Sequence, residues 1–165
     1  CFLTTAIATQ VDGVDIPYPF RSGWYTYDGT NFGLTPHGLE AYKKYLIDNV
    51  DRMAKRIEEG DIMLGEQRIS TSKASQSRIT GMWGAVQIDP TRVIDFKEAT
   101  TGEWTSLNAT QAIAIASAVA DHVQACFTQE KTIGDTINAC TTLAELQAVD
   151  LTTGWPENVP TEEVI

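Results

Sequence analysis

The stretch TPHGLEAYKKYLIDNVDRMAKRIEEG, residues 35–60, decides how the rest of the chain is organised. Thr35 is a good N-cap residue and Pro36 suits the first helical position, while Gly60 is a natural C-cap. The stretch therefore predicts one helix over about residues 36–59, roughly 36 Å long at about 1.5 Å per residue.

Apolar side chains recur along this helix with the spacing of a heptad repeat, and Lys43 interrupts the pattern. Two explanations fit this spacing. The helix either packs on its own domain or forms a parallel coiled coil between identical chains. Under the second explanation the candidate oligomer interface consists of Leu39, Leu46, Val50, Met53 and Ile57.

Residues 1–34 predict a small β and loop segment in front of the helix. The two prolines in Ile16–Phe20 favour extended backbone, and Trp24–Tyr27 alternates before the hairpin turn pair Asp28-Gly29. This segment also carries an aromatic cluster, which fits a patch for a partner or receptor, a small core, or a sugar-stacking surface. Its members are Tyr18, Phe20, Trp24, Tyr25 and Tyr27.

Downstream of the helix the patterns predict a second helix, a β-hairpin and a third helix. Ser72 can cap a helix that ends at about Ile88, and the next alternating segments, 92–97 and 103–106, predict the hairpin. Asn108 with Gln111 predicts a capping box before a helix to about Lys131. Two short helices are expected after it, beginning near residues 132 and 142.

These predictions define an α+β fold with a small N-terminal β/loop segment, one long helix and a helix–β-hairpin–helix C-terminal domain. We place the domain limits at 1–34 for the N-terminal attachment segment, 35–60 for the long helix, 61–77 for a connector, 78–156 for the α+β domain and 157–165 for a flexible acidic tail.

Composition and charge limit the partners of the chain. Its 165 residues include 42% apolar and 21% charged residues, which is typical of a globular domain. The net charge is −10, and residues 98–165 hold one basic residue, Lys131, against ten acidic ones. Since nucleic-acid binding depends on Lys and Arg that neutralise phosphates, we expect no nucleic-acid partner. No apolar run approaches the ~20 residues of a membrane-spanning helix, so no membrane insertion is expected either.

Residue types that could carry chemistry are present, but their patterns favour structural roles. His122 and Cys126 lie four positions apart and can face each other, yet Ala, Val and Phe surround them. Together with Cys140 they lack a metal-site spacing, and three cysteines give no disulfide framework. We therefore predict a protein that is no enzyme, with no catalytic residue, no cofactor and no metal site.

Three segments carry a family resemblance: HVQACF at residues 122–127, TTLAELQAV at 141–149 and GWP at 154–156. With the sequence around them, from residue 78 to 156, they resemble an uncharacterised C-terminal domain family of tail-fibre-like and tail-associated proteins of tailed bacteriophages. The resemblance carries no catalytic residue.

The resemblance implies a non-enzymatic virion protein of the tail, in the fibre, the baseplate or their connection. Such a protein would be made in the bacterial host cytoplasm. It would form a homo-oligomer, with a trimer favoured, and contact other tail proteins. A tail-fibre assembly chaperone absent from the mature virion is the alternative. A module that binds or hydrolyses host glycans is the third possibility.

Overall fold

The structure, a computed structural model, describes residues 10–11, 14–15, 23–98 and 101–159. These residues form helices and small antiparallel strand pairs, which confirms the α+β class. They divide into two compact units. The first unit contains the described residues up to Asn49 together with Ile133–Asp150, and the second contains Val50–Thr132 and the described residues from Leu151 onward.

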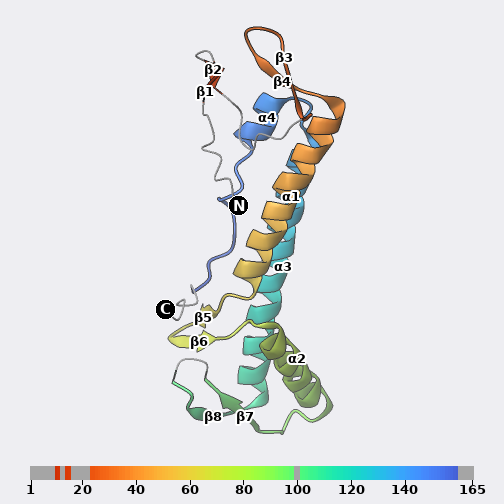
Figure 1. Cartoon of the computed structure of the whole chain (residues 1–165). Coiled ribbons are helices and arrows are strands. Elements are labelled where there is room, and N and C mark those ends of the chain that lie inside the picture. Colours follow the sequence, from red (N-terminus) through yellow and green to blue (C-terminus); the bar gives the residue numbers. More distant parts are fainter. Residues whose placement is uncertain (1–9, 12–13, 16–22, 99–100, 160–165) are drawn as a thin grey trace, which may run out of the picture. The chain divides into compact units, whose positions relative to one another are not determined.

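The described chain has four helices and four hairpins, shown in Figure 1. The helices are α1 (Pro36–Glu58), α2 (Lys73–Ile88), α3 (Ala109–Ala139) and α4 (Leu143–Ala148). Each strand pairs with its neighbour in sequence. The pairs are β1 (Gln10–Val11) with β2 (Val14–Asp15), β3 (Tyr25–Tyr27) with β4 (Phe32–Leu34), β5 (Ile62–Leu64) with β6 (Gln67–Ile69), and β7 (Ile94–Lys97) with β8 (Trp104–Leu107).

In the first unit, helix α1 begins at its predicted cap. The Thr35 hydroxyl accepts a hydrogen bond from the Gly38 backbone N–H at 2.9 Å, and the Thr35 N–H donates to the Trp24 carbonyl at 2.8 Å. A Cβ atom on Gly38 would lie 1.9 Å from the Trp24 carbonyl oxygen. Glycine at this position therefore allows the backbone before β3 to lie directly against the first turn of α1.

The most buried side chains of α1 recur every four residues rather than in the predicted heptad pattern. They are Tyr42, Leu46, Val50, Ala54 and Glu58. Such a row follows one ridge of a straight helix. Of the residues expected at an oligomer interface, Leu46 and Val50 are thus buried within a single chain. The other three, Leu39, Met53 and Ile57, are half-buried.

In the first unit, α1 and the residues of α4 lie near the C-terminal end of α3. Ile137 and Leu146 are almost completely buried. Thr142 caps α4 in a reciprocal capping box with Glu145, and Lys43 Nζ donates to the Asn138 carbonyl at 2.9 Å. The last bond joins α1 to the C-terminal turn of α3 within this unit.

The prediction of a break between residues 131 and 132 is wrong, because α3 continues without interruption to Ala139. The buried Ile133 and Ile137 continue the apolar spacing of the preceding turns. Packing of this row outweighs the weak helix propensity of Gly134.

Within the region expected to be a connector, residues 61–77, the chain forms the β5–β6 hairpin and starts α2. Gly65 occupies the first position of the two-residue turn with a φ of +63°. This left-handed backbone favours glycine and is typical of a tight hairpin.

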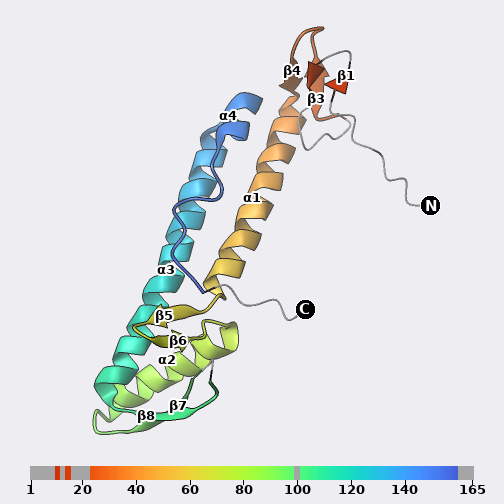
Figure 2. The same cartoon turned by 90° about the vertical axis from the view of Figure 1, so that its left-hand side faces the viewer.

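The core of the second unit joins both of its hairpins to α2 and α3. Figure 2 shows α2 and the two hairpins gathered around the N-terminal half of α3. The buried apolar residues of this core are Ile62, Ile69, Ile79, Met82, Val86, Leu107, Ala112, Ile115 and Val119.

The segment expected to be a flexible tail begins with a backbone contact. Val159 N–H donates to the Asp61 carbonyl at 2.5 Å, and the two residues form an antiparallel bridge. A Cβ atom on Gly60 would lie 2.2 Å from Asn158 Nδ2, so a larger residue at position 60 would displace the Asn158 side chain. Residues 160–165 lie outside the described residues.

Candidate functional site

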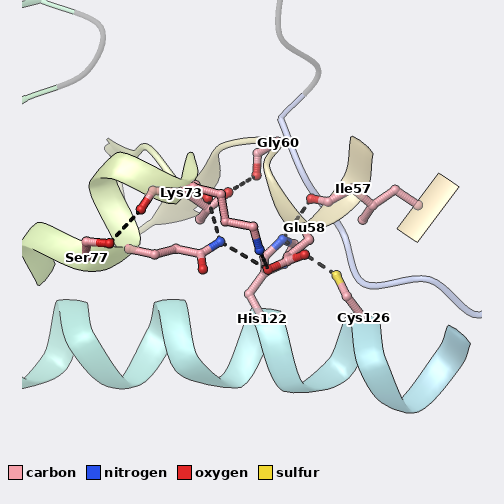
Figure 3. A network of polar contacts seen from close by, with 9 residues as sticks. Ile57, Glu58, Gly60, Lys73, Ser77, His122 and Cys126 are labelled. Carbon is pink, nitrogen blue, oxygen red and sulfur yellow. Dashed lines mark hydrogen bonds and ion pairs between the residues drawn. The ribbon is translucent and has the colours of Figure 1, made fainter. Parts of the chain in front are cut away.

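A polar network in the second unit surrounds the C-terminal end of α1 (Figure 3). Glu58 is 6% exposed, and its Oε1 atom accepts from Lys73 Nζ at 2.5 Å and from Gln76 Nε2 at 3.3 Å. The buried Thr71 hydroxyl donates to the Gly60 carbonyl at 2.5 Å. These bonds fasten the end of α1 to the first turns of α2, and Lys73 compensates a buried carboxylate that would otherwise be costly.

His122 and Cys126 extend from α3 toward this network, as Figure 3 shows. His122 Nε2 lies 3.0 Å from the Ile57 carbonyl oxygen and 3.9 Å from Cys126 Sγ. Because a carbonyl oxygen can only accept, Nε2 carries the hydrogen and donates it to Ile57. In this tautomer Nε2 cannot take a proton from the Cys126 thiol.

The charge environment also keeps the Cys126 thiol protonated. Burial, followed by the negative charges of Glu58 and Glu130, raises the pKa of Cys126 to about 11. A nucleophilic cysteine needs the opposite shift. The two residues are therefore brought together as predicted from their spacing, and their arrangement is that of a buried structural contact.

An apolar groove on the second unit runs between α2 and α3 and has a volume of about 450 Å³. Trp83 of α2 and Phe127 of α3 lie in its walls, and each is 47% exposed. None of the lining residues is charged, although 21% of the whole chain is. The complete lining is Gln76, Ile79, Thr80, Trp83, Ala116, Ser117, Val119, Ala120, Val123, Gln124 and Phe127.

The groove exists because α3 carries two apolar stripes. The buried stripe contains Ala112, Ile115, Val119, His122 and Cys126. A second stripe, with the same alternating spacing of three and four residues, lies beside it on the helix. This second stripe consists of Ile113, Ala116, Ala120, Val123 and Phe127 and is half-buried or exposed. The spacing of the apolar residues along α3 does not by itself show which of the two stripes the fold covers.

The described part of the predicted aromatic patch surrounds the β3–β4 hairpin. Tyr25 and Tyr27 contact Phe32 with ring centroids 6.3 Å and 4.9 Å apart, and Trp24 lies 6.4 Å from Tyr42. Burial and the neighbouring Tyr42 raise the pKa of Tyr25 to about 12. Tyr18 and Phe20 lie outside the described residues.

Among the described residues, no group of three or more His, Cys, Asp and Glu side chains comes together in a way that could hold a metal ion.

No helix within the described ranges has both the length and the apolar character needed to cross a membrane.

The fold and this surface define a small α+β protein with a buried polar network and an uncharged apolar groove. The chain belongs to the family described as Domain of unknown function (DUF4376), whose profile matches residues 41–153. The match begins within α1 and ends after α4. No curated protein matches the chain. No solved structure matches it either.

Proposed function

We propose that this chain is a non-enzymatic structural component of a bacteriophage tail and works by docking against other subunits. The observation that carries the docking role is the uncharged groove between α2 and α3. Trp83 and Phe127 remain about half exposed there, and large aromatic side chains of this kind are favoured at the centres of protein interfaces. The tail itself is proposed from the sequence resemblance of residues 78–156.

The occupant of the groove is a second copy of the same chain. Two molecules that each carry a net charge of −10 repel each other unless their contact avoids the charged surface. The groove lining has no charge, and Ala116 and Ala120 allow a second helix to approach closely. A homo-oligomer, with a trimer favoured, therefore uses this groove.

The oligomeric state of the full chain tests this role. We expect an oligomer in sedimentation at micromolar concentration, and we expect Ala120→Glu to shift it to a monomer because the carboxylate would be buried in the interface. Ala114→Glu is the matched control, since Ala114 is also an exposed alanine of α3 but does not line the groove. A wild-type chain that sediments as a monomer would contradict the proposal.

The assignment to the tail has a separate test. Mass spectrometry of purified virions should detect the chain in a fixed copy number. Presence in infected cells together with absence from virions would favour the assembly chaperone. Activity on host envelope polysaccharide that is lost on a single Asp or Glu substitution would favour the glycan-hydrolysing alternative.

A further inference from the structure

A second pocket in the second unit lies between α2 and the β7–β8 hairpin and has a volume of about 470 Å³. It shares only the buried Ile79 with the groove. This size is typical of sites for small molecules. Its apolar part is formed by Ile79 and Met82 from α2 and by Ile94 and Phe96 from β7. Its polar part is formed by Ser70, Ser75, Arg78, Asp95, Lys97 and Trp104.

The pocket is positively charged in a strongly acidic chain. Arg78 and Lys97 line it from two different elements, and neither forms an ion pair with any residue that the structure describes. The carboxylate of Asp95 is the only negative charge in the lining, and it accepts a hydrogen bond from the Ser106 hydroxyl at 3.0 Å. Two cations against one carboxylate leave a net charge that favours an anion.

Trp104 adds a flat surface at the same pocket. It is 69% exposed, and its partner across the hairpin is Lys97, whose Nζ lies 5.9 Å from the indole ring centroid. This cation–π contact places the ammonium group over one face of the indole ring. A ligand ring can stack on the other face of the indole, with a negative group at its edge directed toward the ammonium group of Lys97.

We propose that this pocket binds a small organic anion that consists of a carboxylate carried on a ring. The planar guanidinium group of Arg78 can donate two parallel hydrogen bonds to a carboxylate, and Lys97 adds a second positive charge. The ring of the ligand stacks on the exposed indole of Trp104, whose cross-strand partner is Lys97. This site shares only the buried Ile79 with the proposed oligomer interface, and its charged residues lie outside the groove lining.

Isothermal titration calorimetry of the full chain with naphthoate tests the proposal. We expect saturable binding that weakens as salt is added, and at least a tenfold weaker interaction with naphthamide, which has the same ring and no charge. Galacturonate distinguishes the source of the ring. If only naphthoate binds, the ligand is an aromatic acid. If galacturonate binds, the ligand is a sugar acid. Either result supports a ligand with a carboxylate on a ring.

Three variants locate the site. Arg78→Gln and Lys97→Gln should each weaken naphthoate binding roughly fivefold to tenfold, and Trp104→Ala should weaken both naphthoate and naphthamide. Arg92→Gln is the control, because it removes one exposed positive charge from the same unit outside the pocket. An unchanged melting temperature is expected for Arg78→Gln and Arg92→Gln, whose side chains are exposed. Lys97→Gln and Trp104→Ala also remove the cation–π contact and should lower the melting temperature slightly. Equal affinity for naphthoate and naphthamide, no binding of either acid, or equal effects of Arg78→Gln and Arg92→Gln would overturn the proposal.

Discussion

Charge and packing conflict at Glu130. Burial raises the pKa of its carboxyl group, and the nearby carboxylates of Asp51 and Glu58 raise it further. The folded chain therefore holds the Glu130 proton more tightly than the unfolded chain does. The stability that this proton contributes is complete below the unfolded pKa of roughly 4.3 and is lost as the pH rises through the higher folded pKa.

This linkage predicts that Glu130→Gln stabilises the chain near neutral pH. Removing the ionised group should raise the free energy of unfolding by about 0.5 kcal/mol at about pH 7, and the gain should shrink toward about pH 3, where Glu130 is protonated in both states. Urea denaturation at the two pH values measures both effects. Glu103→Gln, at an exposed glutamate of the β7–β8 hairpin, is the control and should show no such gain. A gain that stays constant with pH would contradict the electrostatic explanation.

At the scale of single elements, the helix caps were predictable because they depend on residues that are close in sequence. Asn108 Oδ1 accepts from the Gln111 N–H at 3.0 Å, and the Asn108 N–H donates to Gln111 Oε1 at 3.0 Å. This is the reciprocal capping box that the sequence predicts for α3. The same reasoning located Thr35 at the start of α1 and Ser72 at the start of α2.

The cap of α3 gives a prediction about stability. Asn108→Ala should lower the free energy of unfolding by about 1 kcal/mol, because it leaves the first backbone N–H groups of a long helix without this acceptor. Asn108→Asp preserves the acceptor and should cost much less. Thermal unfolding followed by circular dichroism measures both variants, and equal losses would show that the cap contributes little.

Features that depend on distant contacts were not predictable in the same way. The β5–β6 hairpin has strands of three residues, too short for a clear alternating pattern, and its formation depends on Ile62 and Ile69 joining the core. The residues around Thr132 contain real helix-start signals, yet α3 continues because Ile133 and Ile137 are buried. Tertiary packing outweighed local preference in both places.

In the candidate site, too, contacts between residues close in sequence were predictable and contacts between distant residues were not. The spacing of His122 and Cys126 predicted their contact correctly. The acceptor of the His122 hydrogen bond, the carbonyl of Ile57, lies 65 positions away in the sequence, and no local pattern indicates it. The pocket beside α2 likewise combines Arg78 with Lys97 and Trp104, which become neighbours only when the hairpin packs on the helix.

At the scale of the whole molecule, both compact units are built from segments that are far apart in the chain. Residues 133–150 complete the unit that starts before Asn49, and residues from Leu151 onward return to the unit of α2 and the two hairpins. The return ends with Val159 paired to Asp61, whose carboxylate also accepts from Arg68 at 2.7 Å. Late segments of the chain thus complete structures that early segments begin.

Two truncations test the role of this return. A chain that ends at Pro156 loses the Val159 hydrogen bond and the Asn158 contact with Gly60, and its free energy of unfolding should fall by about 1 to 2 kcal/mol. A chain that ends at Val159 keeps both contacts and serves as the control. We expect its melting temperature to match that of the full chain. Equal losses in the two truncated chains would assign the effect to residues 160–165.

The buried thiol of Cys126 gives experimental access to the motions of the second unit. Its side chain is 0% exposed and its pKa is about 11, so an alkylating reagent at mildly alkaline pH meets almost no thiolate in the closed protein. In a chain whose other two cysteines are replaced by serine, the labelling rate would therefore measure how often the end of α1 separates from α3. Cys126 is thus a built-in probe for the rate at which these two helices separate.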